Sequence, residues 1–165
     1  MDLVHRPIDF VTDMEYILER HCRINYACDC PWKRKMPYED YRREWFGMPA
    51  QMQGFLNPLR DSAKGSKAIA EIIEDGAGTT VAYFWVSFEE TESGFCYAEV
   101  QDIYVEEVFR EAGIASQLMA YAETKAKENG AKVIRSGTGI ENTKSIAMHG
   151  KLGYYQYRCE FEKLL

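Results

Sequence analysis

The pattern of hydrophobic and polar positions changes its period near residue 65. Before that point, apolar residues recur every three to four positions, which predicts helices over residues 9–24 and 38–63 behind a short first strand at Leu3–Pro7. The glycine and proline of Gly47-Met48-Pro49 predict an interruption in the second helical region. Beyond a polar loop at 61–66 the period becomes two, which is the spacing of strands.

Three strands in succession follow this loop. They are expected at Ala68–Ile73, Thr79–Glu89 and Phe95–Val105. Asp75-Gly76 lies in the first connection and is a strong hairpin signal, and Ser93-Gly94 lies in the second. Strands joined by tight turns pair antiparallel, so this part of the chain predicts a meander.

The last third of the chain alternates helices and strands. We expect a helix, a strand, a short helix and a final strand, in that order, at Glu111–Lys127, 131–135, Thr143–Lys151 and Tyr154–Lys163. The strand–helix–strand connection over residues 98–135 makes a right-handed crossover between parallel strands. The whole pattern predicts an α+β fold, an α/β/α sandwich with a mixed, mostly antiparallel sheet. No boundary divides the chain, so we expect one domain over residues 1–165.

Charge and hydropathy bear on the partners of the protein. The net charge is −6 and the densest basic run, at 32–35, is short, so we expect no nucleic-acid partner. No apolar stretch is as long as the roughly 18 residues of a membrane span. The first residues contain no signal-peptide core, so we expect no membrane association and a cytoplasmic protein. An acidic surface fits a cationic acceptor such as an amine, and it fits ordinary solubility as well.

The five cysteines form no recognisable metal motif. An odd number of them in a protein expected in the cytoplasm indicates reduced thiols. Zinc is an alternative at His21, Cys22, Cys28 and Cys30, which crowd one segment. Their spacing does not match a zinc knuckle and no second pair follows, so we expect no metal site.

A strand, a loop and a helix meet at Val105–Ala115, in the arrangement that binds phosphate. The first amides of a helix have no internal partners and lie at the positive end of its dipole, which favours an anion. Gly113 has no side chain where an anion must approach the backbone, and Arg110 can add a charge-assisted hydrogen bond. On Gly113 alone, we would favour an ordinary strand–loop–helix connection.

Two motifs in this region resemble those of the GNAT superfamily of acyl-CoA N-acyltransferases. Arg110-x-x-Gly113-x-Ala115 is similar to the family's Gln/Arg-x-x-Gly-x-Gly/Ala signature, and Val105 lies where the family usually has a valine at the end of its fourth strand. The stretch 142–154 is similar to a second motif of asparagine, a small residue, tyrosine or histidine, and Leu-Gly-Phe. Together the motifs cover about residues 95–165, and the N-terminal part agrees only in its order of elements.

The resemblance implies both a fold and an activity. It implies a six- to seven-stranded sheet whose parallel pair, 95–105 and 131–135, splays around CoA. It also implies an N-acetyltransferase that moves an acetyl group by direct transfer from acetyl-CoA, its donor substrate, to a primary amine of a small molecule or protein. A homodimer is common in the family. The implied cofactor-binding residues lie on the fourth strand, the loop after it and the short helix: Ile103, Tyr104, Val105, Arg110, Glu111, Ala112, Gly113, Ile114, Ala115, Asn142 and Ser145.

Two catalytic residues are implied in the same way. His149 stands where the family often has a tyrosine that protonates the departing CoA thiolate, and a histidine packed under the sheet is the alternative. Glu99 has the spacing at which some members place a catalytic glutamate, so we expect it to be the base or the anchor of the acceptor amine. Asp102, or a base elsewhere in the chain, is the alternative. Strict alternation separates Glu99 and Gln101 from Asp102 and Tyr104, unless a bulge shifts the count.

A second function stays open beside this one. A CoA-binding regulatory or sensor module with weak or no turnover is the alternative, favoured by the histidine at position 149 and by Gly150. A glycine destabilises a helix by about 1 kcal/mol relative to alanine, so Gly150 predicts fraying of the short helix. The aromatic residues between 26 and 46 fit an acceptor pocket or the ordinary core of a helical pair.

Overall fold

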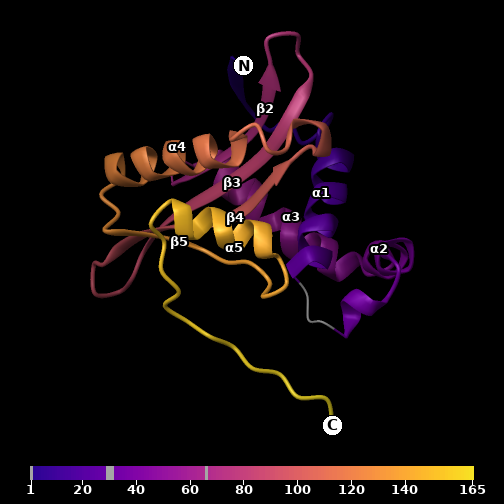
Figure 1. Ribbon diagram of the computed structural model, residues 1–165. Helices are drawn as coiled ribbons and strands as arrows, with labels where there is room; N and C mark the ends of the chain where they lie inside the picture. Colours follow the sequence, from indigo (N-terminus) through magenta and orange to yellow (C-terminus); the bar gives the residue numbers. More distant parts are fainter. Residues whose placement is uncertain (1, 29–31, 66) are drawn as a thin grey trace.

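A mixed sheet of five strands runs through the described part of the molecule (Figure 1). The computed structural model describes residues 2–28, 32–65 and 67–165, and the strands follow one another across the sheet in chain order. They are β1 (Leu3–Pro7), β2 (Ala68–Asp75), β3 (Thr80–Glu90), β4 (Cys96–Val105) and β5 (Val133–Ser136). The first four pair antiparallel and β5 pairs parallel with β4, which confirms the expected parallel pair.

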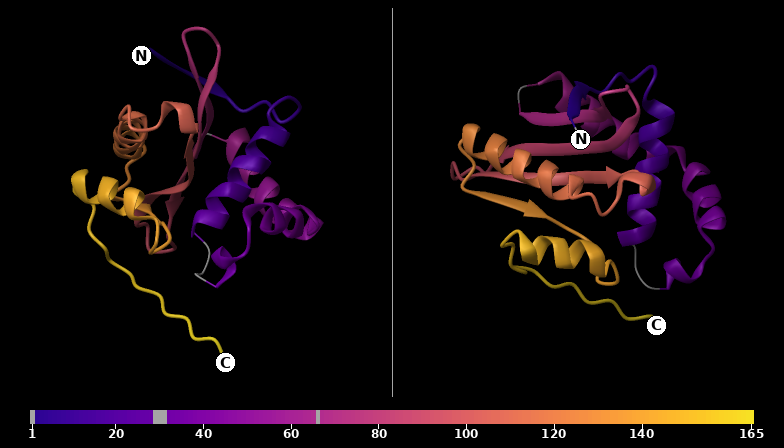
Figure 2. Two further views of the ribbon diagram at one scale, coloured as in Figure 1. Left: turned by 45° about the vertical axis from the view of Figure 1, so that its right-hand side comes forward. Right: turned by 45° about the horizontal axis from the view of Figure 1, so that its top comes forward.

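Helices cover both faces of this sheet. On one face lie α1 (Met14–Cys28), α2 (Tyr38–Phe46) and α3 (Pro49–Lys64), and on the other lie α4 (Ile114–Glu128) and α5 (Thr143–Lys151). Figure 2 shows the two helical layers on opposite sides of the strands. Two short 3-10 turns, η1 (Lys33–Lys35) and η2 (Glu107–Phe109), precede α2 and α4. This is the layered arrangement that the hydrophobic pattern predicts.

The central strand, β3, is buried on both of its faces. Tyr83 and Trp85 pack toward α1–α3, whereas Phe84 and Val86 pack toward α4. Successive side chains of a strand point to opposite faces, so a continuous apolar run is the pattern of a strand that is covered twice. The sheet therefore separates two apolar layers, and a polar side chain in the middle of it needs a specific partner.

The expected last strand at Tyr154–Lys163 is wrong. Residues 154–165 form no regular secondary structure, so the described sheet has five strands rather than six or seven. Figure 1 shows this segment leaving the body of the molecule beyond α5. Its alternating pattern is that of a strand, but Tyr155, Tyr157 and Phe161 are exposed. Such a pattern makes a stable strand only where a neighbouring strand and a covering layer complete it, and the described part of the chain provides neither here.

Two helices begin later than the sequence predicts, and one predicted break is confirmed. α1 begins at Met14 rather than near residue 9. α4 begins at Ile114 rather than near Glu111, because Gly113 has a φ of +79°, which a right-handed helix cannot contain. The second helical region is interrupted at Gly47-Met48-Pro49 as expected, since α2 ends before this sequence and α3 begins within it.

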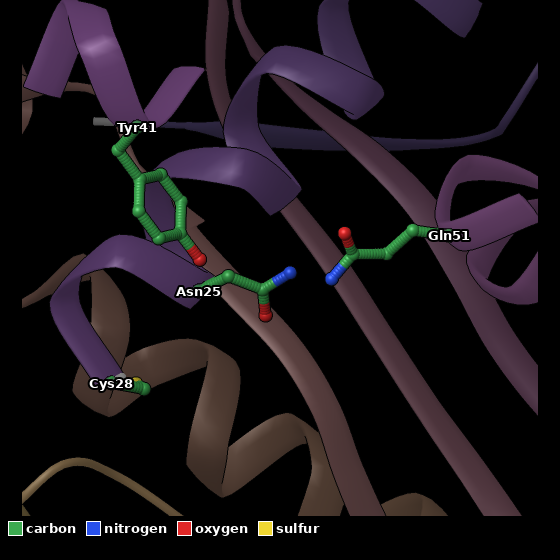
Figure 3. Close-up of a pocket in the computed structure, with 4 residues that line it drawn as sticks. All are labelled: Asn25, Cys28, Tyr41 and Gln51. Carbon is green, nitrogen blue, oxygen red and sulfur yellow. The ribbon is translucent and has the colours of Figure 1, made fainter. Parts of the chain in front are cut away.

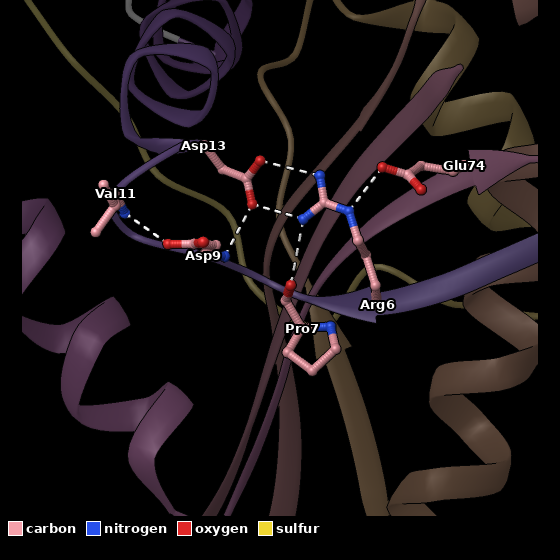
Figure 4. Close-up of polar contacts among 6 residues, drawn as sticks. All are labelled: Arg6, Pro7, Asp9, Val11, Asp13 and Glu74. Carbon is pink, nitrogen blue, oxygen red and sulfur yellow. Dashed lines mark hydrogen bonds and ion pairs between the residues drawn. The ribbon is translucent and has the colours of Figure 1, made fainter. Parts of the chain in front are cut away.

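Arg6 on β1 ties the start of α1 to the sheet (Figure 4). Its guanidinium donates two hydrogen bonds to Asp13, of 2.7 and 2.9 Å, and Nε donates one of 2.6 Å to Glu74 on β2. Asp13 is 8% exposed and also accepts a hydrogen bond from the backbone N–H of Asp9. A two-point contact between guanidinium and carboxylate fixes both distance and direction, so α1 starts at a defined place over the β1–β2 edge.

The middle of α1 is held at the far end of β4. Tyr16 Oη and Arg20 Nε each donate a hydrogen bond of 2.7 Å to Glu106, the residue that follows β4. The backbone N–H of Glu106 in turn donates to the Val81 carbonyl on β3. With α1 fixed at both points, the polar residues of its next turn are placed over the middle of β4.

We expect Asp13→Asn to destabilise the protein in a pH-dependent way. Hydrogen bonds from Arg6 hold the pKa of Asp13 below its usual range. The stability that this carboxylate contributes is therefore present above about pH 4, the unfolded-state pKa, and is lost as the pH falls through the lower folded-state pKa. Urea unfolding at pH 7 should show a loss of about 2 kcal/mol, and the difference from wild type should shrink as the pH falls below about 4.

Asp61→Asn is the matched control for this experiment. Asp61 also pairs with a cation, Lys64 at 3.5 Å, but both side chains are about three-quarters exposed, and exposed pairs add little to stability. This variant should unfold like wild type. If Asp13→Asn behaves in the same way, or if its deficit is constant from pH 7 to pH 3, the Arg6 contact does not hold α1 in place.

Candidate functional site

β4 and β5 diverge in the middle of β4. Their register begins at Tyr97 opposite Val133 and ends at Val100 opposite Ser136. β4 then continues to Val105 with only β3 beside it among the described strands. A strand edge without a neighbour presents N–H and C=O groups that a ligand can bind. The implied cofactor-binding residues Ile103–Val105 lie on this open edge. This is where the expected splaying of β4 and β5 would leave room for the cofactor.

The turn after β4 forms a cradle of backbone amides. The first intrahelical hydrogen bond of α4 runs from the N–H of Gln117 to the carbonyl of Gly113 at 3.0 Å. The amides of Ile114, Ala115 and Ser116 therefore precede the hydrogen-bonded ladder of the helix, at the positive end of its dipole. Glu111 also has a positive φ, of 67°, a strained conformation that tends to occur at functional sites. The turn therefore presents free helix-start amides at the place where the sequence predicts a phosphate cradle.

Arg110 folds back onto the strand instead of reaching outward. Its Nε donates to the Val105 carbonyl at 3.0 Å, and its guanidinium lies 5.2 Å from the ring centroid of Tyr104. Nη1 also lies 3.7 Å from a carboxylate oxygen of Glu107. In this conformation Arg110 braces the turn between β4 and α4, so its expected contact with phosphate needs a different rotamer.

The first turn of α5 lies beside the cradle. Lys144 Nζ forms an exposed ion pair of 2.9 Å with Glu111, which lowers the pKa of that carboxyl. Asn142 caps the helix, since its Oδ1 accepts a hydrogen bond of 3.4 Å from the Ser145 N–H. The two implied cofactor-binding residues of α5 therefore have a structural task in ordering its N-terminus.

His149 lies one turn further along α5. Its Nδ1 is 2.8 Å from the Ser145 carbonyl, and its ring meets Tyr154 edge to face at 5.3 Å. Nε2 is buried and has no hydrogen-bond partner among the described residues. A buried nitrogen without a partner costs about 1–3 kcal/mol, so Nε2 is an atom that a ligand or a water would satisfy.

A bulge in β4 brings Glu99 and Asp102 to the same face of the sheet. Glu99 pairs with Ser87 and Asp102 pairs with Trp85, and the register shifts between these two pairs. Residues opposite one another on antiparallel strands share a face, and positions 85 and 87 of β3 lie on one face by alternation. The separation expected from strict alternation is wrong, and the bulge that the sequence left open is the reason. Both carboxylates therefore face α1–α3.

Asp102 is the centre of a buried polar network. The residue is 4% exposed, and its Oδ2 lies 2.7 Å from His21 Nδ1 on α1 and accepts a 3.1 Å hydrogen bond from Tyr83 Oη on β3. Burial, with the Asp102 charge beside it, raises the pKa of the Tyr83 hydroxyl well above its ordinary value. Tyr83 therefore remains a donor, and the carboxylate is held from two directions.

The His21 ring is fixed on all sides. It stacks on Phe55 of α3 with ring centroids 3.6 Å apart, and it meets Trp45 of α2 edge to face at 5.8 Å. Asn25, one helical turn further along α1, places its Nδ2 3.0 Å from His21 Nε2. In the sequence, His21 is a candidate only for zinc. One feature of the sequence does mark His21 as a possible functional residue. It lies in the apolar stripe of a helix, where a titratable residue is unusual.

A small polar cavity opens beyond Asn25 (Figure 3). Its volume is about 290 Å³ and its lining comes from α1, α2 and α3: Asn25, Cys28, Tyr41 and Gln51. Figure 3 shows the two amides facing one another, with the Tyr41 hydroxyl beside Asn25. Of the aromatic residues considered for an acceptor pocket, Tyr41 lines this cavity, whereas Trp45 belongs to the core beneath it.

The loop between β5 and α5 touches the end of α1 next to this cavity. Gly139 lies so close that an added Cβ would be 2.8 Å from Cys28 Cα and 3.0 Å from the Ala27 carbonyl. Such distances require something to move, so only glycine fits here. Thr138 Oγ1 is also 3.9 Å from Cys28 Sγ. The loop that follows β5 therefore contacts Cys28, a residue of the cavity lining.

Neither a metal site nor a membrane helix is found in the described ranges. No three His, Cys, Asp or Glu side chains among these residues come together in a way that could hold a metal ion. Cys30, one of the four residues considered for zinc, lies outside the described residues. No described helix is long and apolar enough to cross a membrane.

Comparison with known proteins identifies a family. Residues 20–154 match the model of the acetyltransferase (GNAT) family, which is more than half of the chain. A search of curated proteins finds no significant match. The family match begins within α1 and spans the sheet from β2 onward, the turn before α4, and α5.

Solved structures share the fold over almost the whole chain. Aminoglycoside 6'-N-acetyltransferase AAC(6')-Ih from Acinetobacter baumannii has a TM-score of 0.65 at 19% identity, with 99% of each chain covered. AAC(6')-Iy, in complex with the bisubstrate analogue CoA-S-monomethyl-acetylneamine, has a TM-score of 0.64 at 18% identity, covering 100% of this chain and 99% of that one. A transcriptional regulator from Bacillus halodurans scores 0.66 at 19% identity, covering 99% and 100%. At such identities the likeness establishes the α+β fold and not the activity.

We expect Gly113→Glu to weaken acetyl-CoA binding at least tenfold, about 1.4 kcal/mol. The new carboxylate would stand at the amide cradle, where it repels phosphate. Gly130→Glu is the matched control: Gly130 follows the other end of α4 with a φ of +77°, and at both glycines an added Cβ meets nothing within 4 Å. Both variants carry a similar backbone strain of about 1–2 kcal/mol. Calorimetry that finds equal affinity in the two variants and wild type would place the pyrophosphate elsewhere.

Proposed function

This chain belongs to the GNAT family of acetyltransferases, and we propose that it moves an acetyl group from acetyl-CoA to the primary amine of a small polar molecule by direct transfer. The observation that carries the proposal is the open edge of β4 at residues 101–105 followed directly by the amide cradle of α4. An edge for an extended arm and a cradle for a pyrophosphate, in sequence, fit the two ends of CoA. The thioester of acetyl-CoA supplies the activated acetyl group.

The residues on the donor side divide this work. Backbone groups of Ile103, Tyr104 and Val105 would pair with the pantetheine arm, and amides from Arg110 through Ala115 would hold the pyrophosphate, with Asn142 and Ser145 facing the cofactor from α5. His149 would protonate the departing thiolate. Its Nδ1 donates to the Ser145 carbonyl, so Nε2 would first take up a proton and then pass it to the thiolate. Nε2 has no partner among the described residues, which supports that role.

The acceptor would enter from the α1–α3 side of the sheet. The cavity there is small, about 290 Å³, and the described residues of its lining, Asn25, Cys28, Tyr41 and Gln51, are polar and carry no formal charge. Such a lining suits a ring-sized amine whose other groups are hydroxyls or amides better than a folded protein or a strongly charged molecule. Two of the similar structures are described as a 6'-N-acetyltransferase of aminoglycosides and as a complex with an acetylneamine analogue. Those acceptors are also hydroxylated ring amines, but they carry several ammonium groups, so they share the rings and hydroxyls of the proposed class and not its low charge.

Glu99 is the proposed anchor of the acceptor's ammonium group. It faces the same side as the cavity, and no described residue forms a hydrogen bond or an ion pair with its carboxylate. A carboxylate without a partner on a central strand is free to bind an incoming cation. Of the two roles that the sequence suggests for Glu99, base and anchor, we therefore propose the anchor.

A CoA-binding regulator is the second candidate function. One similar structure is described as a transcriptional regulator. The expected fraying of the short helix, which favoured this candidate, is absent, because α5 continues through Gly150 to Lys151. The polar cavity on the acceptor side favours the enzyme, since a regulator that reads only CoA has no need of it.

We expect the wild-type protein to release CoA thiol from acetyl-CoA when a small hydroxylated amine is present. An assay of thiol release should give kcat/KM values at least tenfold higher for amino sugars and amino alcohols than for lysine-containing peptides, a difference of about 1.4 kcal/mol. Calorimetry with acetyl-CoA provides the control for folding and donor binding. Binding without turnover on any amine would favour the regulator, and no binding would exclude both candidates.

We expect Glu99→Gln to raise KM for the amine about tenfold while kcat and acetyl-CoA affinity change little. A hydrogen bond to a charged group is worth about 1.5–3 kcal/mol, and only the contact to the acceptor is removed. Glu89→Gln, near the exposed end of β3, is the matched control and should behave like wild type. A fall in kcat with unchanged KM would instead make Glu99 the base.

A further inference from the structure

We propose that His21 is the general base that deprotonates the acceptor's ammonium group, and that Asp102 positions it. This inference rests on the proposed acetyl transfer and adds a residue outside both family motifs. An amine arrives at neutral pH largely as R–NH3⁺ and has no lone pair until it loses a proton. The transfer therefore needs a base on the acceptor side of β4, and His21 is a titratable side chain that contacts both the cavity lining and that strand.

The contacts of His21 leave a lone pair on Nε2. Nδ1 lies 2.7 Å from a carboxylate oxygen of Asp102, which has no proton to give, so Nδ1 is the nitrogen that bears hydrogen. Nε2 lies 3.0 Å from Nδ2 of Asn25, an amide nitrogen that only donates, so Nε2 accepts. The Asn25 contact fits the neutral ring, whose Nε2 lone pair can take up a proton once Asn25 is displaced from it.

This lone pair lies between the two halves of the site. Asn25, its present donor, lines the acceptor cavity, so an ammonium group in the cavity can replace Asn25 at Nε2. On the other side, Asp102 lies beside the bulge of β4, two residues beyond the last pair with β5 at Val100. The open edge proposed for the pantetheine arm begins at that point. His21 is thus next to the place where acceptor and thioester would meet.

The ring is also held rigidly enough to act as a base. Phe55 covers one face of it and Trp45 meets it edge to face. Tyr83 donates a second hydrogen bond to the Asp102 oxygen that His21 contacts. The titratable groups in contact with this pair are Asp102 on β4 and Tyr83 on β3. Glu99 lies on the same face of β4, and Tyr41 of α2 lines the cavity beside Asn25, whereas the rings that touch His21 from α2 and α3, Trp45 and Phe55, do not titrate. Asp102 is therefore the group that stabilises the imidazolium formed in the reaction.

Two protons leave the acceptor nitrogen during the transfer. His21 Nε2 takes one proton from R–NH3⁺ and becomes imidazolium, and the neutral amine attacks the thioester carbonyl carbon. A C–N bond forms, the C–S bond breaks, and its electron pair leaves on sulfur. The second proton leaves the nitrogen as the amide forms and ends on the thiolate, directly or through His149. His21 returns the first proton to solvent, so the products are the N-acetylated amine, CoA thiol and one proton.

The test compares His21→Gln with His5→Gln. The glutamine amide of the first variant keeps a donor for Asp102 but has no basic nitrogen. At pH 7 we expect kcat/KM for the best amine to fall about 100-fold, the usual share of a general base, with acetyl-CoA affinity unchanged. His5 is a matched control, because its Nδ1 also lies 2.8 Å from a carboxylate, Glu71, and its ring also meets an aromatic ring, Tyr121, but it lies on β1. His5→Gln should keep full activity.

The pH dependence separates a base from a structural residue. As the pH rises to about 10, the amine loses its proton in solution, so the ratio of wild-type to His21→Gln activity should fall from about 100 to below about 10. A ratio that stays constant with pH would assign His21 a structural role and overturn the proposal. If His21→Gln does not fold, Asp102→Asn is measured instead, with the same expected change in ratio, since it removes the charge that orients and stabilises the ring.

The outcome also distinguishes this inference from the proposed function. Wild-type protein that releases no thiol with any amine contradicts acetyl transfer itself. Active wild-type protein with a His21→Gln variant of equal kcat/KM at pH 7 and intact acetyl-CoA affinity contradicts only the role of His21.

Discussion

A carboxylate buried in the middle of a sheet must find hydrogen-bond donors, because an unpaired buried charge costs several kcal/mol. Asp102 is 4% exposed on β4 and finds its donors in His21 of α1 and Tyr83 of β3. The contact between His21 and Asp102 therefore fixes the position of α1 over β4. The ion pairs of Arg6 with Asp13 and of Arg20 with Glu106 hold the same helix at its start and middle. The acceptor cavity, which needs α1 as one wall, depends on all three contacts.

β4 is the boundary between the two substrates in this account. Its open edge and the turn that follows it are proposed for acetyl-CoA, and its α1-facing side chains are proposed for the amine. The bulge near Gln101 allows one strand to do both, because it turns Asp102 to the face of Glu99 while the backbone beyond it separates from β5. A regular strand would keep Asp102 and Glu99 on opposite faces. Under the proposed function, the bulge therefore serves both substrates.

The sequence predicts most of the fold and the strand–turn–helix proposed for the donor, because these depend on local patterns. The period of apolar residues defines the helices and strands, and the glycine and the helix start at residues 113–115 define the cradle. The acceptor half depends on contacts between distant residues. No pattern in β4 shows that its register shifts after Val100, and no spacing in α1 shows that His21 meets Asp102, which lies 81 residues away. The last strand fails for the same reason, since its pattern at 154–163 needs a partner that local sequence cannot supply.

A crystal structure of the protein with acetyl-CoA tests the central claim that β4 separates a donor edge from an acceptor face. The account predicts that the pyrophosphate lies on the amides of residues 110–115, that the pantetheine arm follows residues 103–105, and that the acetyl carbonyl reaches the His21 side of the sheet. A pyrophosphate bound away from the start of α4, or an acetyl group on the α4 face with no path to His21, would contradict it.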